Sequence, residues 1–315
     1  MLGSAPGAVP DATRARPERF PRPALLGFRH VTNSAAAEMA KKYGLSRMGA
    51  RPPLGRYLAE AWRRRYFAIT LSRYTVEAGD SDSRLGSLWV IVRPFLSAVI
   101  YGLLFGVILG PDRPHNFVPH LLVGVTTFEF FAKCFDQGAK SITGNQSLVT
   151  SLAFPRILLP ISAVLRNIFE LWPMWVVLVL ALLAFQQWPS WNWLLVIPML
   201  GLMTLLNTGL ALISARLTVH FRDLSQIIPF INRLLFYGSG IFFTLQSVTK
   251  NQTLIHLFQI NPVYDFVEAM HSFLLPGYGP LTQWEWTALV GWSVLLPVIG
   301  LLFFWSAEER YGRVE

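Results

Sequence analysis

Charged residues are scarce in this sequence: they make up 14% of its 315 residues, whereas apolar residues make up 53%. Soluble domains carry about 25% charged residues, because their surfaces face water. The deficit excludes an ordinary water-soluble fold and indicates that lipid covers much of the surface. Cysteine is almost missing, and the single Cys134 excludes an intramolecular disulfide framework and a cysteine-based metal cluster.

Motifs that carry chemistry are also scarce. The six histidines are scattered and form no H-x-x-x-H pair. Gly138-Ala139-Lys140-Ser141 lacks the Gly-x4-Gly-Lys frame of a phosphate-binding loop, so we expect no nucleotide on this chain. Asp80 and Asp82 resemble the paired aspartates of some glycosyltransferases, but the same spacing is common in polar turns. The sequence therefore predicts no catalytic residue, no metal site and no cofactor bound by this chain.

The net charge of +9 is concentrated near the amino terminus. Residues 1–87 hold fifteen Lys/Arg and seven Asp/Glu, a net of +8, which leaves +1 for the rest of the chain. Because this excess adjoins the first apolar run, we attribute it to anionic lipid headgroups rather than to nucleic acid. Residues 1–53, rich in Ala, Pro and Arg, are predicted to be a basic, largely disordered cytoplasmic extension.

Six apolar runs predict six transmembrane helices, because each approaches or exceeds the roughly 18–20 residues that cross hydrocarbon. The runs are Leu88–Leu109, Phe117–Ala139, Ile157–Phe185, Trp193–Ala215, Ile227–Leu245 and Trp286–Ser306. Before them, Leu54–Tyr74 has the pattern of an amphipathic helix lying in the membrane plane, with a solvated helix as the alternative. We therefore expect an all-α polytopic membrane protein: an interfacial helix and loop at 54–87, six spans within 88–306, and a cytoplasmic tail at 307–315.

The basic loop residues predict that both termini are cytoplasmic. Loops on the amino-terminal side contain Lys140, Arg156, Arg216, Arg222, Arg310 and Arg313, whereas the opposite loops contain Arg113 and Lys250. On that opposite side, Leu254–Ile260 and Val263–Leu275 are apolar but too short to span. They predict a re-entrant helical hairpin, with a small folded external cap as the alternative.

Charged residues inside the predicted spans allow two interpretations. Glu129 and Lys133 are four residues apart, as are Arg166 and Glu170, so each pair can meet on one helix face. In one interpretation these pairs neutralise each other between packed helices. In the other, the cations of the cytoplasmic half receive an anionic headgroup from the inner leaflet. Those cations are Arg93, Lys133, Arg166 and Arg233.

Aromatic residues recur at helical spacing on the first and fifth runs. Tyr101 and Phe105 lie one turn apart, and Phe236 and Phe243 are predicted to share a face of the fifth run, beside Tyr237. Aromatic rings pack against the apolar faces of sugars, so these stripes fit a carbohydrate passage. Packing among themselves or against lipid is the alternative.

Several short motifs resemble those of one transporter family. They are Arg73-Tyr74, Arg84-Leu85-Gly86-Ser87-Leu88-Trp89 with Pro94, Gly144-Asn145, Phe154-Pro155-Arg156, Leu159-Pro160, Phe221-Arg222-Asp223-Leu224 and Asn261-Pro262. From about Leu54 onwards, the chain resembles the permease subunit of ABC-2-type exporters of lipid-linked polysaccharides, the family of O-antigen, capsule and teichoic acid export. The long link Thr75–Arg84, together with Leu152-Ala153-Phe154-Pro155-Arg156, is most similar to actinobacterial members that export cell-wall galactan on a polyprenyl diphosphate.

The resemblance implies a homodimeric permease of the bacterial inner membrane, served by two copies of a separate ABC ATPase that binds ATP and Mg²⁺. It implies two cytoplasmic coupling helices, within 145–155 and 219–225, and a periplasmic gate hairpin at 253–275. The coupling residues would be Asn145, Ser147, Leu148, Phe154, Arg156, His220, Phe221, Arg222 and Asp223. The substrate entrance and headgroup residues would be Arg84, Leu85, Gly86, Arg93, Lys133, Arg166 and Arg233. The channel aromatics would be Tyr101, Phe105, Phe236, Tyr237 and Phe243, and the gate residues Asn261, Pro262 and Tyr264.

Three other functions also fit the sequence. An ABC-2 exporter of a drug or a lipid would keep the fold and need a narrow, apolar passage. A membrane glycosyltransferase or acyltransferase would use Asp80 and Asp82 and would require a metal ion. A structural partner in cell-wall assembly would transport nothing.

Overall fold

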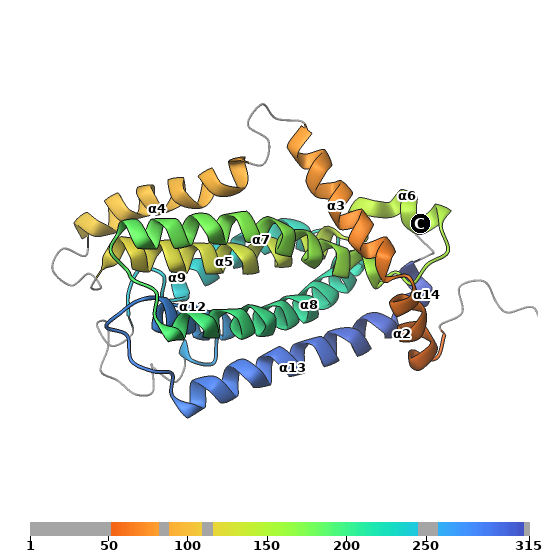
Figure 1. The fold of residues 1–315 in the computed structure, drawn as a ribbon. Helices are drawn as coiled ribbons and strands as arrows, with labels where there is room; N and C mark the ends of the chain where they lie inside the picture. The colour runs from red at the N-terminus through yellow and green to blue at the C-terminus, as the bar shows by residue number, and fades with distance from the viewer. Residues whose placement is uncertain (1–51, 82–87, 109–115, 245–257, 312–315) are drawn as a thin grey trace, which may run out of the picture. The chain divides into compact units, whose positions relative to one another are not determined.

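The computed structural model describes residues 52–81, 88–108, 116–244 and 258–311, and these ranges contain helices and no strand (Figure 1). The all-α prediction is therefore confirmed for the described part of the chain. The α-helices are α2 (Leu54–Arg63), α3 (Arg65–Ser81), α4 (Leu88–Ile108), α5 (Phe117–Lys140), α6 (Gln146–Ser151), α7 (Leu158–Ala184), α8 (Val196–His220), α9 (Leu224–Gly238), α12 (Pro262–Leu274), α13 (Gln283–Ser306) and α14 (Glu308–Tyr311). The 3-10 turns η2 (Thr143–Asn145) and η3 (Trp191–Leu195) precede α6 and α8.

Four helical stretches are long and apolar enough to cross a membrane: α5, α7, η3 with α8, and α13. They correspond to the second, third, fourth and sixth predicted runs. Helix α4, which matches the first run, is 21 residues long. The described helices thus support a multi-pass membrane protein, while the count of six spans stays a prediction.

The fifth predicted run, Ile227–Leu245, differs from the structure. Helix α9 begins earlier, at Leu224, and ends at Gly238 after 15 residues. At 1.5 Å per residue it is about 22 Å long, which is shorter than the roughly 30 Å of a hydrocarbon core. The helix stops because Gly240 takes the left-handed conformation, with φ of 69°, directly after the C-cap Ser239.

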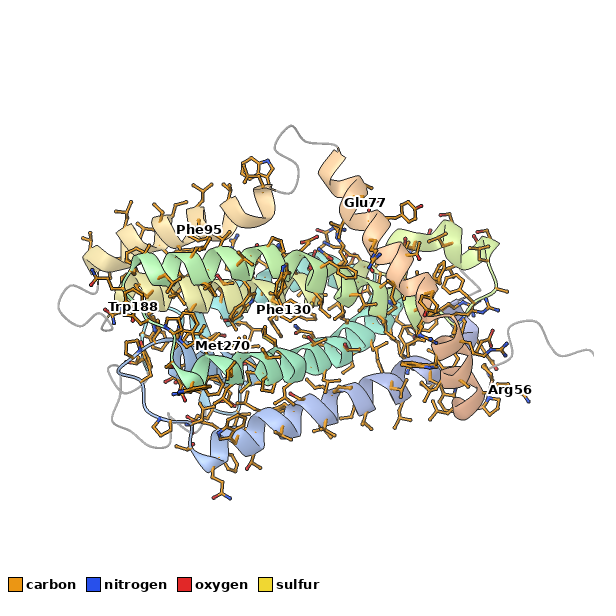
Figure 2. The ribbon with its side chains drawn as sticks, in the orientation of Figure 1. Arg56, Glu77, Phe95, Phe130, Trp188 and Met270 are labelled. Carbon is orange, nitrogen blue, oxygen red and sulfur yellow. The ribbon has the colours of Figure 1, made fainter. Side chains whose placement is uncertain are left out.

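The predicted amphipathic helix Leu54–Tyr74 is in fact two helices, because the helix is interrupted at Arg64 between α2 and α3. Both are amphipathic. Tyr57 on α2 and Ala68 on α3 are buried, whereas Arg56 and Glu77 are exposed on the outer sides of the two helices (Figure 2). Their position in the membrane plane stays a prediction.

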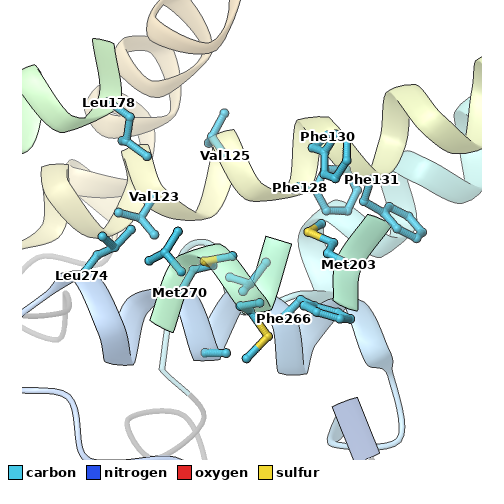
Figure 3. Packing of buried hydrophobic residues seen from close by; sticks show 14 of the residues in the cluster. Val123, Val125, Phe128, Phe130, Phe131, Leu178, Met203, Phe266, Met270 and Leu274 are labelled. Atoms are coloured by element: carbon cyan, nitrogen blue, oxygen red, sulfur yellow. The ribbon is translucent and has the colours of Figure 1, made fainter. Parts of the chain in front are cut away.

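The main hydrophobic core surrounds α5, which packs against α4, α7, α8, α9 and α12. Val123 and Phe130 of α5 meet Met203 of α8 and Phe266 and Met270 of α12 in one buried cluster (Figure 3). Most of α5 is therefore buried, although its sequence is the least apolar of the four long stretches. Its charged side chains are tolerated because they face other helices, as described below.

Helices α8 and α13 pack closely because two glycines meet. A Cβ atom on Gly209 would stand 2.3 Å from the carbonyl carbon of Leu296, and one on Gly300 would stand 2.6 Å from the Gly209 carbonyl oxygen. Small residues allow helix backbones to approach this closely in membranes.

Helix α12 confirms that the second short apolar stretch is helical. It has 13 residues, nearly all buried, and begins with Pro262 at its first position, while the Asn261 side chain accepts a hydrogen bond from the Val263 amide. Most of Leu254–Ile260 lies outside the described residues. The re-entrant hairpin as a whole therefore stays a prediction.

Candidate functional site

The two predicted coupling segments lie side by side. Segment 1 (residues 145–155) follows α5 and contains α6, while segment 2 (residues 219–225) joins α8 to α9. A small cavity of about 30 Å³ lies between Gln146 and Val149 on one side and Val219 and Arg222 on the other. The sequence predicted two coupling helices, but only segment 1 holds a helix of its own. Segment 2 is a turn at Phe221–Asp223, because α9 starts at the next residue.

Both segments expose apolar side chains among polar ones. Leu152 is 49% exposed and Phe221 is 67% exposed. The rest of the predicted coupling residues are also on the surface or half-buried: Asn145, Ser147, Leu148, Phe154, Arg156, His220, Arg222 and Asp223. Exposed apolar residues with a polar rim are typical of a protein-binding surface.

Segment 1 is fixed to the amino-terminal helices. The ring of Phe154 packs against that of Phe67 with centroids 4.9 Å apart, and Arg64 donates a hydrogen bond to the Ala153 carbonyl at 2.5 Å. Arg156 forms a salt bridge of 3.4 Å with Glu308 of α14. These contacts could not be predicted from local patterns, since their partners are far apart along the chain.

Both predicted charge pairs form, and they join into one half-buried ion-pair network. Lys133 lies 3.3 Å from Glu129 on α5, and Arg166 lies 2.9 Å from Glu170 on α7. Lys133 also reaches Glu170 at 3.4 Å and thereby connects the two helices. These four side chains carry no net charge, which favours the structural interpretation for Lys133 and Arg166.

Arg166 also lines a polar pocket of about 210 Å³ between α3, α5 and α7. The pocket walls are Leu71, Thr75, Gln137, Lys140, Ser141, Asn145, Leu159, Ser162, Ala163 and Arg166. Several hydroxyl and amide groups line it together with two cations, which are paired with the carboxylates of Asp136 and Glu170. Lys140 was not among the predicted headgroup residues, because its position beside Arg166 depends on how α5 packs against α7.

The remaining predicted entrance residues are more dispersed. Arg233 is exposed on α9 and close enough to Tyr101 for an electrostatic interaction. Arg93 belongs to α4, but its side chain lies outside the described residues, as does that of Phe105. Arg84, Leu85 and Gly86 fall in a part of the chain that the structure does not describe.

The predicted aromatics meet in a cluster that joins α4, α5 and α9. Phe236 packs against Tyr101 and Phe128, with both pairs of ring centroids 5.1 Å apart. Tyr237 lies against Phe236 at 5.7 Å. The prediction that Phe243 shares a helix face with Phe236 was wrong, because α9 ends before it; Phe242 contacts Phe236 instead, at 5.2 Å. Phe243 turns toward Phe258, 6.5 Å away.

Helix α12 carries a group of buried polar residues that the sequence analysis missed. Asp265 is 1% exposed, and burial, followed by the carboxylates of Glu285 and Glu268, raises its pKa to about 8. Burial and Glu285 also raise the pKa of Glu268 to about 7. The signal was present, since two acids one turn apart interrupt an apolar stretch. Tyr264, a predicted gate residue, is buried beside them and packs edge-on against Phe258 at 6.3 Å.

Two buried histidines connect α12 to α5. The rings of His120 and His271 stack with centroids 3.8 Å apart, and His271 Nε2 lies 2.9 Å from the His120 carbonyl oxygen. The Tyr278 hydroxyl lies 2.6 Å from His120 Nδ1. Burial lowers the pKa of His271 to about 4, so this residue is neutral at ordinary pH. Among the described residues no group of three or more His, Cys, Asp or Glu side chains is arranged to hold a metal ion.

Comparison with known proteins agrees with this geometry. Residues 69–275 match the family described as ABC-2 type transporter. The chain is 27% identical to the O-antigen export system permease protein RfbA of Myxococcus xanthus over 263 residues, which cover 82% of this chain and 98% of that protein. It is 24% identical to the RfbA of Klebsiella pneumoniae over 248 residues, or 78% of this chain and 93% of that protein. It is 26% identical to the polysialic acid transport protein KpsM of Escherichia coli over 197 residues, or 62% of this chain and 76% of that protein.

The family match covers more than half of the chain and includes both coupling segments, the ion-pair network and α12. This chain therefore belongs to the ABC-2 type transporter family.

Proposed function

We propose that this chain is the permease subunit of an ATP-driven exporter that moves a polyprenyl-diphosphate-linked polysaccharide out of the cytoplasm. The observation that carries the proposal is the pair of adjacent coupling segments, of which segment 1 exposes Leu152 and segment 2 exposes Phe221. A permease without an ATPase site of its own needs such a surface to receive the movement of a partner. Membership of the ABC-2 type family supports an ABC ATPase as that partner.

The relatives named for O-antigen export and polysialic acid transport support a polysaccharide as the cargo. Galactan is the specific sugar that we propose, on the grounds of the long link Thr75–Arg84 and segment 1. In the polar pocket, a diphosphate headgroup would replace Asp136 as the partner of Lys140 and share Arg166 with Glu170, because guanidinium and ammonium groups form charge-assisted hydrogen bonds with phosphate oxygens.

The proposed channel forms between two copies of the chain. Helices α4 and α9 each carry exposed apolar side chains, among them Leu103 at 70% and Phe230 at 70% exposure. A second copy on this face would enclose a passage beside the aromatic cluster of Tyr101 and Phe236. Sugar rings would then slide along aromatic faces instead of hydrocarbon.

Export of a lipid rather than a glycan is the second candidate. An apolar cavity of about 510 Å³ between α7, α8 and α12, lined by Trp172, Trp175 and Trp193, favours it. Such a cavity suits a hydrocarbon chain, because its lining is apolar except for the Thr204 hydroxyl and the indole N–H groups.

Depletion of the chain in its native host separates the two candidates. We expect lipid-linked glycan to accumulate on the cytoplasmic side, with galactose as the main sugar if the specific proposal is correct. An unchanged glycan pool with an accumulating phospholipid would refute polysaccharide export and support the lipid candidate. Re-expression of the wild-type chain is the control, and it should restore the glycan pool.

A further inference from the structure

We propose that Glu308 of α14 is a positioning residue that fixes the end of coupling segment 1 to the start of α7. Through this contact, movement of the segment is transmitted to the span instead of being lost in the loop. The transmission of movement rests on the proposed function, because it requires the ATPase, whereas the contact of Glu308 is a property of the permease alone.

Four residues form what we call the Glu308 junction: Tyr57, Arg156, Ile157 and Glu308. The Tyr57 hydroxyl donates to Glu308 Oε2 at 2.8 Å, and the Arg156 amide donates to Glu308 Oε1 at 3.2 Å. The Arg156 guanidinium lies 3.4 Å from the same Oε1 atom. The Ile157 amide donates to the Tyr57 hydroxyl oxygen at 3.2 Å. One carboxylate thus holds together α2, the end of segment 1 and α14.

The junction is buried, which makes its hydrogen bonds specific and costly to lose. Glu308 is 4% exposed and Tyr57 is 1% exposed. Hydrogen bonds to a charged acceptor are about twice as strong as those between neutral groups. A buried amide left without an acceptor costs the full penalty of its desolvation.

The junction binds the two backbone amides that immediately precede α7. The first amides of the helix are satisfied locally, because those of Leu158 and Leu159 donate to the Pro155 and Arg156 carbonyls, and a carboxylate near this end also interacts favourably with the helix dipole. At the N-cap of α7, Ile157, the structure has no local side-chain cap. The amides of Arg156 and Ile157 are bonded instead to Glu308 and Tyr57, which lie 152 and 100 residues away in the sequence.

The residues around the junction form a firm support. Tyr311 stacks on Phe304 with ring centroids 4.7 Å apart and donates a hydrogen bond to the Phe304 carbonyl at 3.1 Å. Trp305 donates to the Pro52 carbonyl at 2.9 Å. These contacts tie α14 and the start of α2 to the end of α13, and Figure 1 shows α2, α6 and α14 gathered at one end of the long helices. The connection between segment 1 and α7 is therefore fixed by both α2 and α14.

The first test uses the purified permease alone and measures hydrogen exchange at the Arg156 and Ile157 amides. In Glu308→Ala we expect exchange at the Arg156 amide to be at least about tenfold faster, the factor for losing a charge-assisted hydrogen bond. The Ile157 amide should exchange faster by a smaller factor, because its acceptor Tyr57 remains but loses its own partner. Glu308→Gln keeps a hydrogen-bond acceptor, so its exchange rates should lie between those of the wild type and of Glu308→Ala. This variant provides the test if Glu308→Ala folds poorly. Glu309→Gln, at the exposed neighbouring residue, is the matched control and should behave as wild type. Unchanged exchange in both Glu308 variants would overturn the proposal.

The second test asks whether the junction transmits movement, using the permease assembled with its ABC ATPase. ATP should change the hydrogen exchange of α7 in the wild type and in Glu309→Gln, and this change should be lost in Glu308→Ala. Faster exchange at the junction with an intact ATP response in α7 would overturn the positioning role and leave a merely structural one. The proposed function fails by a different result: a wild-type complex that hydrolyses ATP yet moves no glycan.

Discussion

Replacing Glu170 with Gln removes the residue that joins the two halves of the half-buried ion-pair network. Glu170 lies 2.9 Å from Arg166 on its own helix and 3.4 Å from Lys133 on α5, so it joins a cation of α7 to a cation of α5. The substitution keeps the shape of the side chain and leaves Lys133 and Arg166 with Glu129 as the one anion of the network. The network then carries a net charge of +1 between packed helices.

The expected cost follows from burial. The Glu170 side chain is 10% exposed, and its partners Lys133 and Arg166 are 21% and 28% exposed. Removing one partner of a fully buried pair costs about 3 kcal/mol or more, and partial exposure of the two cations brings the expected cost to roughly 2 kcal/mol. The matched control is Asp136→Asn, which breaks the exposed pair with Lys140 on the same helix. Exposed pairs contribute at most about 1 kcal/mol.

The assay is the free energy of unfolding of the purified permease in detergent micelles, followed by tryptophan fluorescence. We expect Glu170→Gln to lose at least twice as much stability as Asp136→Asn. If the two variants lose the same amount, the network does not stabilise the contact between α5 and α7. That result would favour the other interpretation of Lys133 and Arg166, in which these cations bind an anionic headgroup.

Three further predictions follow from other parts of the structure. Gly209→Ala should destabilise the permease in micelles by several kcal/mol, because the added methyl group meets the backbone of α13. Gly201→Ala is the control on the same helix and should be neutral, because its methyl group would face open space. The pKa of Asp265 is raised from 3.8 to about 8, so between these pH values the folded state keeps a proton that the unfolded state loses. The free energy of unfolding should therefore fall as the pH rises from about 4 to 8. Asp265→Asn should make this pH dependence weaker, as measured by denaturation curves at several pH values. Phe221→Ser should reduce the amount of ATPase that co-purifies with the permease at least tenfold. Trp188→Ser is the control, because Trp188 is also exposed but lies outside the coupling segments, and it should have no effect. Equal amounts of co-purified ATPase with both variants would contradict the coupling surface.

Local patterns in the sequence predicted the local parts of the structure. The apolar runs matched α4, α5, α7, α8 and α13, since length and hydropathy are properties of a single helix. The pairs Glu129–Lys133 and Arg166–Glu170 were predictable because both members share one helix face.

Features that depend on tertiary packing could not be predicted in the same way. The Lys133–Glu170 contact requires the register between α5 and α7, and the Tyr57–Glu308 hydrogen bond joins residues 251 positions apart. The early end of α9 was a different kind of error. The sequence does contain Gly240, the residue whose left-handed conformation follows the end of α9. The apolar run continues past this glycine through Phe243, so hydropathy alone did not indicate a turn there.

Transport in inside-out membrane vesicles tests the central claim most directly. Vesicles would carry this chain and its ABC ATPase, with lipid-linked glycan labelled on the outer, originally cytoplasmic, face. We predict that ATP moves the label into the lumen, where an added glycosidase no longer reaches it, and that vesicles without the chain show no protection. Glycan that stays fully accessible while the complex hydrolyses ATP would contradict the account.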